Sequence, residues 1–138
     1  MSRVLLCCGA SVSLYKACDL ASRLTQAGHE VRVALTENAA RLVSPQLFAA
    51  VTGQPAATTE WGRERHTAMD HIEWGRWGRG AVAAPASADV AARRALGIAS
   101  DLVTSIALAL DPAVPRVLCP GMNPTMLAAA AVQRNLAI

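Results

Sequence analysis

The start of the chain carries a strand–helix–strand pattern, and this pattern restricts the possible folds more than any other feature. The apolar run at residues 3–8, RVLLCC, is typical of a buried strand. From Val12 to Ala27 apolar residues recur at helical spacing until Gly28 ends the helix, and residues 30–36 then alternate as a second strand. Because a helix connects them, the two strands must run parallel. We therefore expect an α/β domain with a mostly parallel sheet.

The rest of the chain continues this alternation. Two further strands are expected at residues 80–86 and 115–120, whereas residues 53–70 show no regular pattern. Helices are expected at residues 37–53 with a break at Ser44–Pro45, at residues 89–110 with a break at Gly97, and at residues 123–136.

Composition narrows the class of protein. With 138 residues, 53% of them hydrophobic and 17% charged, the chain is predicted to be one folded domain, residues 1–138. The net charge of +3 is scattered, which argues against nucleic acid as a partner, and no apolar run reaches the about 18 residues that span a membrane.

The four cysteines lack the spacing of a metal site, so we expect no metal and interpret them as small buried residues in a reducing cytoplasm.

Small and polar residues follow each of the four predicted strands. Ligands of parallel sheets bind at the carboxyl ends of the strands, so these segments are predicted to share one rim. They are GASVS (9–13), TEN (36–38), PASAD (85–89) and PGMN (120–123).

The segment after the first strand suits a phosphate. Gly9, Ala10 and Ser11 precede a helix, whose free N–H groups and dipole attract anions, and Thr36 could add a second hydroxyl. The segment lacks both GxGxxG and the P-loop motif, which disfavours classical NAD and ATP binding. An equally simple interpretation is that Ser11 only caps the helix.

The segment after the third strand suits a flat ring. Ser87 is placed to cap a helix, and the small side chains of Ala86 and Ala88 would let a ring approach the backbone. The alternative is an ordinary capped helix without a ligand.

Among the histidines, His29 follows a helix-ending glycine and His66 lies in the irregular stretch. His71 precedes an amphipathic segment, with Asp70 and Glu73 as candidates to hold its tautomer. A lone histidine is more often structural than catalytic. Because no Ser/His/Asp set with a nucleophile motif is present, a hydrolase is disfavoured.

Four segments in order resemble the flavin-containing cysteine decarboxylase family, which includes phosphopantothenoylcysteine decarboxylase and the lantibiotic peptidyl-cysteine decarboxylases. They are GASVSLYK, DHIEWGRW, APASADVAARRALGIASDL and PGMNPTM, the last similar to the family's Pro-x-Met-Asn-x-x-Met signature. The resemblance implies a flavodoxin-like or Rossmann-like three-layer fold. It also implies homotrimers, or dodecamers built from trimers, with FMN bound between subunits.

The resemblance also implies roles for individual residues. His71 matches the active-site histidine, and Asn123 matches the asparagine that binds the substrate carboxylate. An amide suits this task because it donates hydrogen bonds without a fixed charge that would stabilise the ground state. By this resemblance, Gly9–Ser11 and Thr36 would bind the FMN phosphate, and the flavin ring would lie against Ala86, Ser87, Ala88 and Asp89. Met122 and Met126 would line the substrate pocket.

The implied activity is FMN-dependent decarboxylation of 4′-phosphopantothenoylcysteine to 4′-phosphopantetheine in coenzyme A biosynthesis, with phosphopantothenate–cysteine ligase as a partner enzyme. The cysteine side chain would be oxidised to a thioaldehyde, so that CO2 can leave. Family members continue into a substrate clamp that carries a cysteine, and residues 1–138 are expected to lack it. Alternatives are a peptidyl-cysteine decarboxylase, a flavin prenyltransferase and a non-catalytic FMN-binding regulator.

Overall fold

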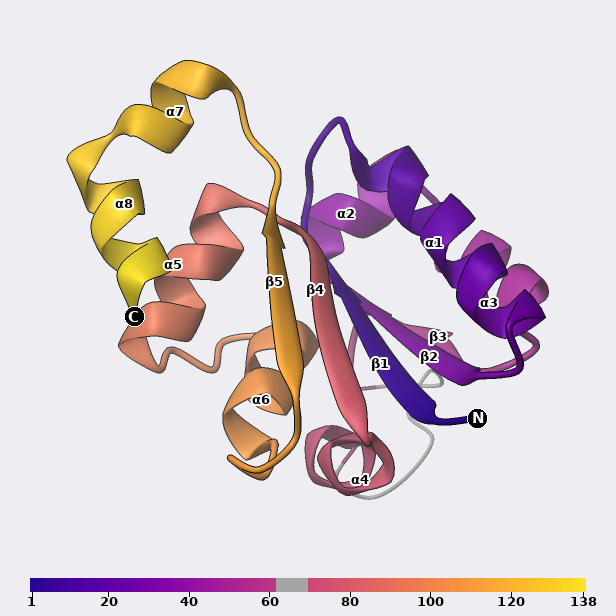
Figure 1. The fold of residues 1–138 in the computed structure, drawn as a ribbon. Helices are drawn as coiled ribbons and strands as arrows, with labels where there is room; N and C mark the ends of the chain where they lie inside the picture. Colours follow the sequence, from indigo (N-terminus) through magenta and orange to yellow (C-terminus); the bar gives the residue numbers. More distant parts are fainter. Residues whose placement is uncertain (62–69) are drawn as a thin grey trace.

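In the computed structural model, which describes residues 1–61 and 70–138, β1 (Arg3–Cys8) is the central strand of an all-parallel sheet (Figure 1). The strand order β3-β2-β1-β4-β5 is that of the doubly wound dinucleotide-binding sheets. The other strands are β2 (Glu30–Leu35), β3 (Ala56–Ala57), β4 (Gly80–Ala86) and β5 (Arg116–Pro120). The predicted fold class is therefore confirmed.

The four predicted strands are all present, but β3 was not predicted. It pairs with β2 through two residues only, Ala56 with Val33 and Ala57 with Ala34. Two residues are too few to show any period, so sequence pattern alone could not reveal this strand.

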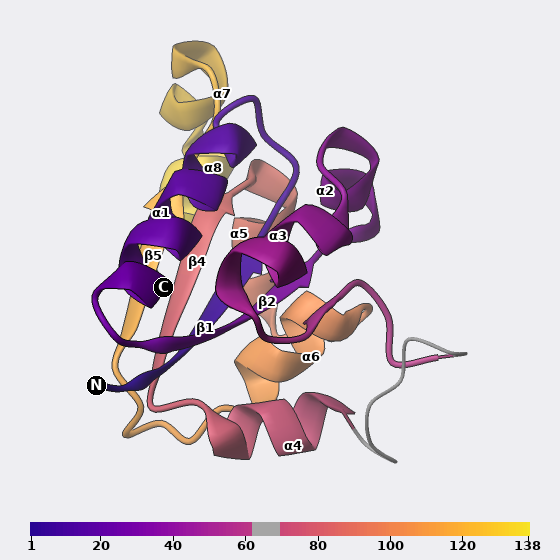
Figure 2. The same cartoon turned by 90° about the vertical axis from the view of Figure 1, so that its right-hand side faces the viewer.

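Helices cover both faces of the sheet, which gives three layers (Figures 1 and 2). Each face of the sheet has its own hydrophobic core, and alternate residues of β1 point into one or the other. Leu6 and Cys8 pack with α1, α2 and α3, whereas Leu5 and Cys7 pack with α4, α5 and α6. The bounds of these helices are α1 (Leu14–Gln26), α2 (Glu37–Leu42), α3 (Pro45–Thr52), α4 (Asp70–Trp77), α5 (Ala88–Leu96) and α6 (Leu102–Ala109).

Both predicted helix breaks are confirmed. Ser44 caps α3 by accepting a hydrogen bond from the Gln46 N–H, and Pro45 occupies the first turn, where its missing N–H costs nothing. Gly97 ends α5 with a φ of 70°, a left-handed conformation that glycine adopts without strain.

The single helix predicted at residues 123–136 was wrong. The chain forms α7 (Pro124–Ala128) and α8 (Ala130–Ala137), with Ala129 between them in an extended conformation. Gln133 Nε2 donates to the Leu127 carbonyl at 2.6 Å, which satisfies one of the free carbonyls at the end of α7. The turn at Ala129 lets α8 pack against α5, and this long-range contact decides the break.

The two tryptophans of α4 pack against the sheet. Trp74 and Trp77 are buried, and the Arg32 guanidinium of β2 lies 5.7 and 4.3 Å from the centres of their rings. Trp61, by contrast, is exposed.

Cys7 and Cys8 are buried on opposite faces of β1, because neighbouring residues of a strand point in opposite directions. Burial, aided by the nearby Asp101 carboxylate, raises the pKa of Cys7 to about 12, so its thiol stays protonated. The prediction of burial was wrong for Cys119, which is exposed on the edge strand β5.

None of the helices described here has the length and apolar character needed to cross a bilayer.

We expect Leu6→Ala to lower the free energy of unfolding by about 2–5 kcal/mol, because Leu6 is fully buried at the centre of the sheet. Urea unfolding followed by circular dichroism would measure the change. Leu42→Ala, at an exposed position of α2, is the matched control and should change it by less than about 0.5 kcal/mol. Equal losses in both variants would contradict the packing described for β1.

Candidate active site

The loops that follow β1, β4 and β5 meet at one rim of the sheet. Gly9 N donates to the Pro85 carbonyl at 2.8 Å, and Gly121 N donates to the Ala86 carbonyl at 2.9 Å. A Cβ on Gly121 would lie 2.7 Å from Ser13 Oγ and 2.9 Å from Pro85 Cβ, so glycine is required for this close approach. Between β1 and β4 the direction of winding reverses, which is where such sheets bind ligands.

The loop between β1 and α1 leaves a helix N-terminus without a side-chain cap. Ser13 occupies the N-cap position but makes no capping hydrogen bond, so the alternative in which Ser11 only caps the helix does not hold. Instead, the Ser11 and Ser13 hydroxyls lie 3.1 Å apart, and Ser11 Oγ accepts from Ser13 N at 3.3 Å. Free N–H groups and two hydroxyls at the positive end of a helix dipole suit an anion such as phosphate.

Two other predicted residues do cap helices. Thr36 Oγ1 accepts from Ala39 N at 3.1 Å at the start of α2, and Ser87 Oγ accepts from Val90 N at 3.2 Å at the start of α5. The predicted cap at Ser87 is thus confirmed. Each hydroxyl still has its own proton to donate, so capping leaves both available to a ligand.

A cleft at the rim brings together six of the predicted site residues. They are Ala10, Thr36, Ser87, Ala88, Asp89 and Met126. The same cleft is also lined by Glu37 and Asn38 of the predicted rim segment 36–38, and by Arg93, Ser100 and Asp101, which sequence reasoning missed. Gly9, Ser11 and Ala86 are neighbours of these residues along the chain.

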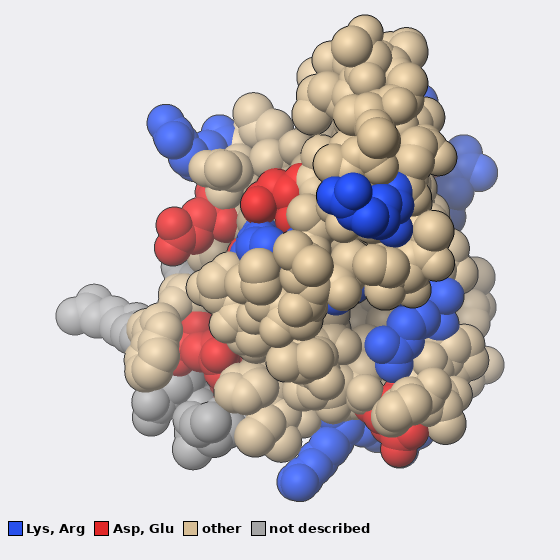
Figure 3. All heavy atoms as spheres, turned by 90° about the vertical axis from the view of Figure 1, so that its left-hand side faces the viewer, with Lys and Arg blue, Asp and Glu red and all other residues tan. Residues whose placement is uncertain are grey.

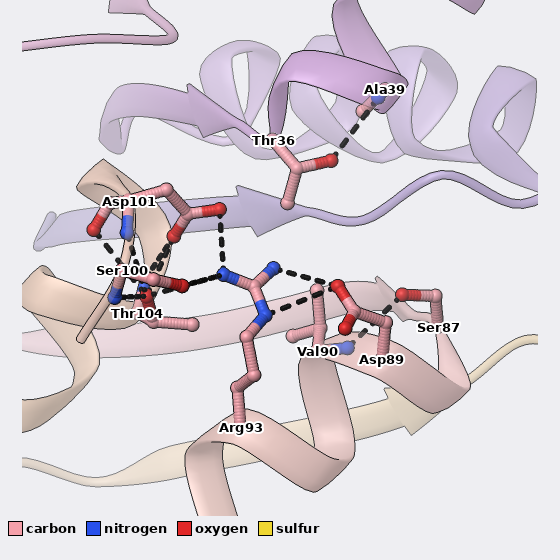
Figure 4. A network of polar contacts seen from close by, with 9 residues as sticks. All are labelled: Thr36, Ala39, Ser87, Asp89, Val90, Arg93, Ser100, Asp101 and Thr104. Atoms are coloured by element: carbon pink, nitrogen blue, oxygen red, sulfur yellow. Dashed lines mark hydrogen bonds and ion pairs between the residues drawn. The ribbon is translucent and has the colours of Figure 1, made fainter. Parts of the chain in front are cut away.

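Arg93 is the centre of the polar contacts in this cleft (Figure 4). Its Nη2 lies 2.9 Å and its Nε 3.1 Å from Asp89 Oδ2, while its Nη1 lies 3.0 Å from Asp101 Oδ2 and 2.8 Å from Ser100 Oγ. The guanidinium therefore joins the first turn of α5 to the N-cap of α6.

The charge state of Asp101 follows from its neighbours. Burial alone would raise the pKa of this carboxyl, but hydrogen bonds from the Thr104 side chain and backbone, together with the Arg93 guanidinium, hold it below its usual range. Asp101 and Thr104 also form a capping box at the start of α6. Asp101 is consequently a carboxylate at neutral pH.

A signal for part of this network was present in the sequence. Asp89 and Arg93 are four residues apart on a predicted helix, the spacing at which opposite charges pair. The pairing of Arg93 with Asp101 had no such signal, because the turn at Gly97 lies between them.

Asn123 caps α7, since its Oδ1 accepts from Met126 N at 2.9 Å. This bond fixes the amide and leaves both of its N–H donors for a ligand. Asn123 is exposed, Met122 is half-buried, and Met126 is 45% exposed at the cleft.

His71 is held by a residue that was not predicted. Its Nδ1 lies 2.5 Å from Glu60 Oε2, and its backbone N–H donates to the same oxygen at 3.1 Å. The predicted partner Glu73 instead pairs with Arg32 at 2.9 Å, and Asp70 is fully buried. A carboxylate on Nδ1 favours the proton there and leaves Nε2 as the free nitrogen.

The sheet separates His71 from Asn123 within one chain. Helix α4, which begins with Asp70 and His71, lies at the amino ends of the strands, whereas α7 follows their carboxyl ends (Figures 1 and 2). His29 has a structural contact, as its Nδ1 accepts from Ser2 N at 3.1 Å. His66 lies outside the described residues.

No group of three or more His, Cys, Asp or Glu within residues 1–61 and 70–138 is placed to hold a metal ion.

The family model described as Flavoprotein matches residues 1–138. The chain belongs to this flavoprotein family. Among curated relatives, the coenzyme A biosynthesis bifunctional protein CoaBC of Escherichia coli (strain K12) is 40% identical over 136 residues, and that of Bacillus subtilis (strain 168) is 38% identical over 135 residues. These matches cover 99% and 98% of this chain, which spans about a third of each relative's length (33%).

Solved structures of flavoproteins agree with the fold. The FMN-dependent cysteine decarboxylase SpaF superposes with a TM-score of 0.90 at 32% identity, over 99% of this chain and 78% of SpaF. A C175S mutant of PPC decarboxylase in complex with pantothenoylaminoethenethiol gives a TM-score of 0.86 at 28% identity, over 99% of this chain and 75% of that one. Both likenesses extend over the rim loops described above.

We expect Asp101→Asn to lower the free energy of unfolding at about pH 7 by about 1–3 kcal/mol, because it removes the charge that Arg93 needs while Asn still caps α6. The depressed pKa of Asp101 stabilises the folded state above the unfolded value of about 4, and this is lost as pH falls through the folded pKa.

The difference in the free energy of unfolding between the wild type and Asp101→Asn should therefore shrink as the pH is lowered below about 4. Urea unfolding at several pH values would measure this difference. The control is Asp19→Asn, which breaks the exposed pair of Asp19 with Arg23 on α1 and should have little effect. A pH-independent loss in Asp101→Asn would contradict the ion-pair explanation.

Proposed function

We propose that the chain binds FMN and decarboxylates a cysteinyl carboxylate, converting 4′-phosphopantothenoylcysteine to 4′-phosphopantetheine in coenzyme A biosynthesis. The observation that carries the proposal is the 40% identity, over almost the whole chain, with a bifunctional protein of coenzyme A biosynthesis. Three of the four segments that match the decarboxylase motifs, those that begin at Gly9, Ala84 and Pro120, lie at the rim and contribute to its cleft.

The residues at the rim fit FMN. The uncapped N-terminus of α1, with Ser11 and Ser13, suits its phosphate, and Gly9 and Ala10 belong to the same loop. Thr36 can donate from its hydroxyl, and Ser87 and Ala88 line the cleft with short side chains that let a flat ring approach the backbone. When bound, FMN would supply the two-electron oxidation of the cysteine side chain that allows the carboxylate to leave.

Asn123 would bind the carboxylate of the substrate through its two free N–H donors. Met122 and Met126, on either side of it, would form the apolar wall of the same pocket. His71, with Nδ1 held by Glu60, would present Nε2 as the group that exchanges a proton with the substrate.

His71 and Asn123 would have to come from different copies of the chain, since one copy holds them at opposite ends of the sheet. This supports a homo-oligomer, a trimer or a dodecamer of trimers, with sites between copies. Helix α7, at the projecting top of the molecule in Figure 3, carries no charged side chain, and Met126 and Leu127 on it are 45% and 38% exposed. Exposed Val12 and Tyr15 of the α1 end add apolar surface.

A peptidyl-cysteine decarboxylase is the second candidate. It is favoured by the TM-score of 0.90 with SpaF, which is an FMN-dependent cysteine decarboxylase. Both candidates share the C–C bond cleavage and differ in whether a phosphorylated small molecule or a peptide C-terminus carries the cysteine.

We further propose a reducing cytoplasmic location and cooperation with phosphopantothenate–cysteine ligase, whose product is the proposed substrate. The free cysteines among the described residues and the bifunctional nature of the curated relatives support this proposal.

The purified protein should show a bound flavin in its visible absorption spectrum and should release CO2 from 4′-phosphopantothenoylcysteine under anaerobic conditions. A peptide ending in cysteine serves as the second substrate, and faster CO2 release from it would favour the second candidate. Flavin binding with no CO2 from either substrate would contradict decarboxylation. It would point to a regulatory flavoprotein or to a flavin prenyltransferase, and activity with dimethylallyl phosphate would identify the prenyltransferase. Failure to bind FMN would refute the proposal.

We expect Asn123→Asp to weaken substrate binding by about tenfold or more while FMN remains bound, since a carboxylate would repel the carboxylate of the substrate. Asp caps helices as well as Asn does, so α7 is retained. Asn135→Asp on α8 adds the same charge and is the matched control. Wild-type KM in Asn123→Asp would remove the pocket assignment.

We expect His71→Asn to reduce kcat by about 100-fold or more with FMN still bound, because Asn cannot exchange the proton. His29→Asn, at the structural histidine, is the control and should leave kcat unchanged. Normal turnover in His71→Asn would exclude a catalytic role for His71.

A further inference from the structure

The rim cleft contains more negative than positive charge. Three carboxylate residues line it, Glu37, Asp89 and Asp101, and Arg93 is the one Lys or Arg among its described lining residues. An anionic cofactor such as FMN would meet net repulsion in this cleft if the carboxylates were not neutralised. The cation that neutralises two of them therefore matters for any such ligand.

Arg93 is bound on two sides and largely shielded from water. The side chain of Arg93 is 15% exposed and that of Asp101 is 18% exposed. Water and salt therefore screen this pair much less than an ordinary surface pair. Asp89 is 71% exposed and depends on Arg93 to hold it along the helix. Burial alone would lower the pKa of Arg93, but the neighbouring Asp101 and Asp89 raise it above its usual value, so its charge is permanent.

The contacts of Arg93 join two parts of the cleft wall. Asp89 belongs to the first turn of α5, directly after Ser87 and Ala88, and Asp101 starts α6. Ser100, in the turn between the two helices, also accepts a hydrogen bond from the same guanidinium (Figure 4). Without these contacts, the first turn of α5 would be attached to α6 only by the chain itself and by apolar packing.

Resting on the function proposed above, we propose that Arg93 is a positioning residue of the cofactor cleft. Its guanidinium neutralises Asp89 and Asp101 and holds the segment 87–89 against the N-terminus of α6. Arg93 acts on the flavin through these carboxylates and not by direct contact. The electrostatic part of this role also predicts the redox behaviour of bound FMN, since extra negative charge disfavours the reduced, more anionic form.

The test uses Arg93→Gln, which keeps a polar side chain of similar length but removes the charge. We expect the Kd for FMN to rise about tenfold and the midpoint potential of bound flavin to become more negative. Because the cause is repulsion, raising the salt concentration should reduce the loss of affinity. FMN fluorescence quenching and anaerobic reductive titration measure the two quantities.

Two further variants separate charge from folding. Arg93→Lys keeps the charge and should restore most of the potential, and Asp89→Asn added to Arg93→Gln should recover most of the lost affinity because it removes one carboxylate. Arg23→Gln, which breaks the same i,i+4 pair with Asp19 on an exposed part of α1, controls for the change in net charge. Urea unfolding of each variant confirms that binding is measured on folded protein.

An unchanged Kd for FMN and an unchanged flavin potential in Arg93→Gln would overturn the proposal. So would a double variant, Arg93→Gln with Asp89→Asn, that binds FMN no more tightly than Arg93→Gln, or a loss of FMN affinity that salt does not reduce. These outcomes require that the wild type bind FMN. If the wild type does not bind FMN, the proposed function fails and not the role of Arg93 alone.

Discussion

The parallel pairing of β1 with its neighbours is the constraint on which the rest of the structure depends. β1 is buried on both faces and pairs in parallel with β2 on one side and β4 on the other. Parallel pairing requires a helical crossover after each strand, so every strand must end at the same rim. The short, polar loops of the rim are a consequence of this topology, and the close contacts of Gly9 and Gly121 keep them together.

Helix capping gives the rim its chemical character. Helices are capped by the side-chain oxygens of Thr36, Ser87 and Asn123, each of which accepts a backbone N–H. Accepting this bond fixes the side chain and leaves its own O–H or N–H protons free to donate to a ligand. α1 differs, because Ser13 at its N-cap position forms no side-chain bond and Ser11 is turned toward Ser13. The same rim thus offers rigid donors at three positions and an uncapped helix end at the fourth, a combination suited to a ligand with a phosphate and a polar ring.

The distribution of the candidate groups between the two ends of the sheet connects the fold to its assembly. The rim holds the candidate cofactor residues, and Asn123 caps α7 beyond β5, while α4, which begins with Asp70 and His71, lies at the amino ends of the strands, with Glu60 against the His71 ring. Under the proposed function, chemistry that needs both groups would occur between copies, so folding of one chain and formation of a complete site would be separate events. The ion pairs of Arg93 lie within one copy, so its proposed effect on cofactor binding would be separable from completion of the site.

The sequence by itself determined the features that depend on neighbours along the chain. Apolar patterning predicted four strands, and the residue types at Pro45, Gly97 and Ser87 predicted two helix breaks and a cap, because each follows from the conformations of a few consecutive residues. Tertiary structure alone decided the strand β3, the turn at Ala129, the contact of Glu60 with His71 and the pairing of Arg93 with Asp101. These features arise where separate segments pack together, and their energies come from contacts through space that no local pattern records.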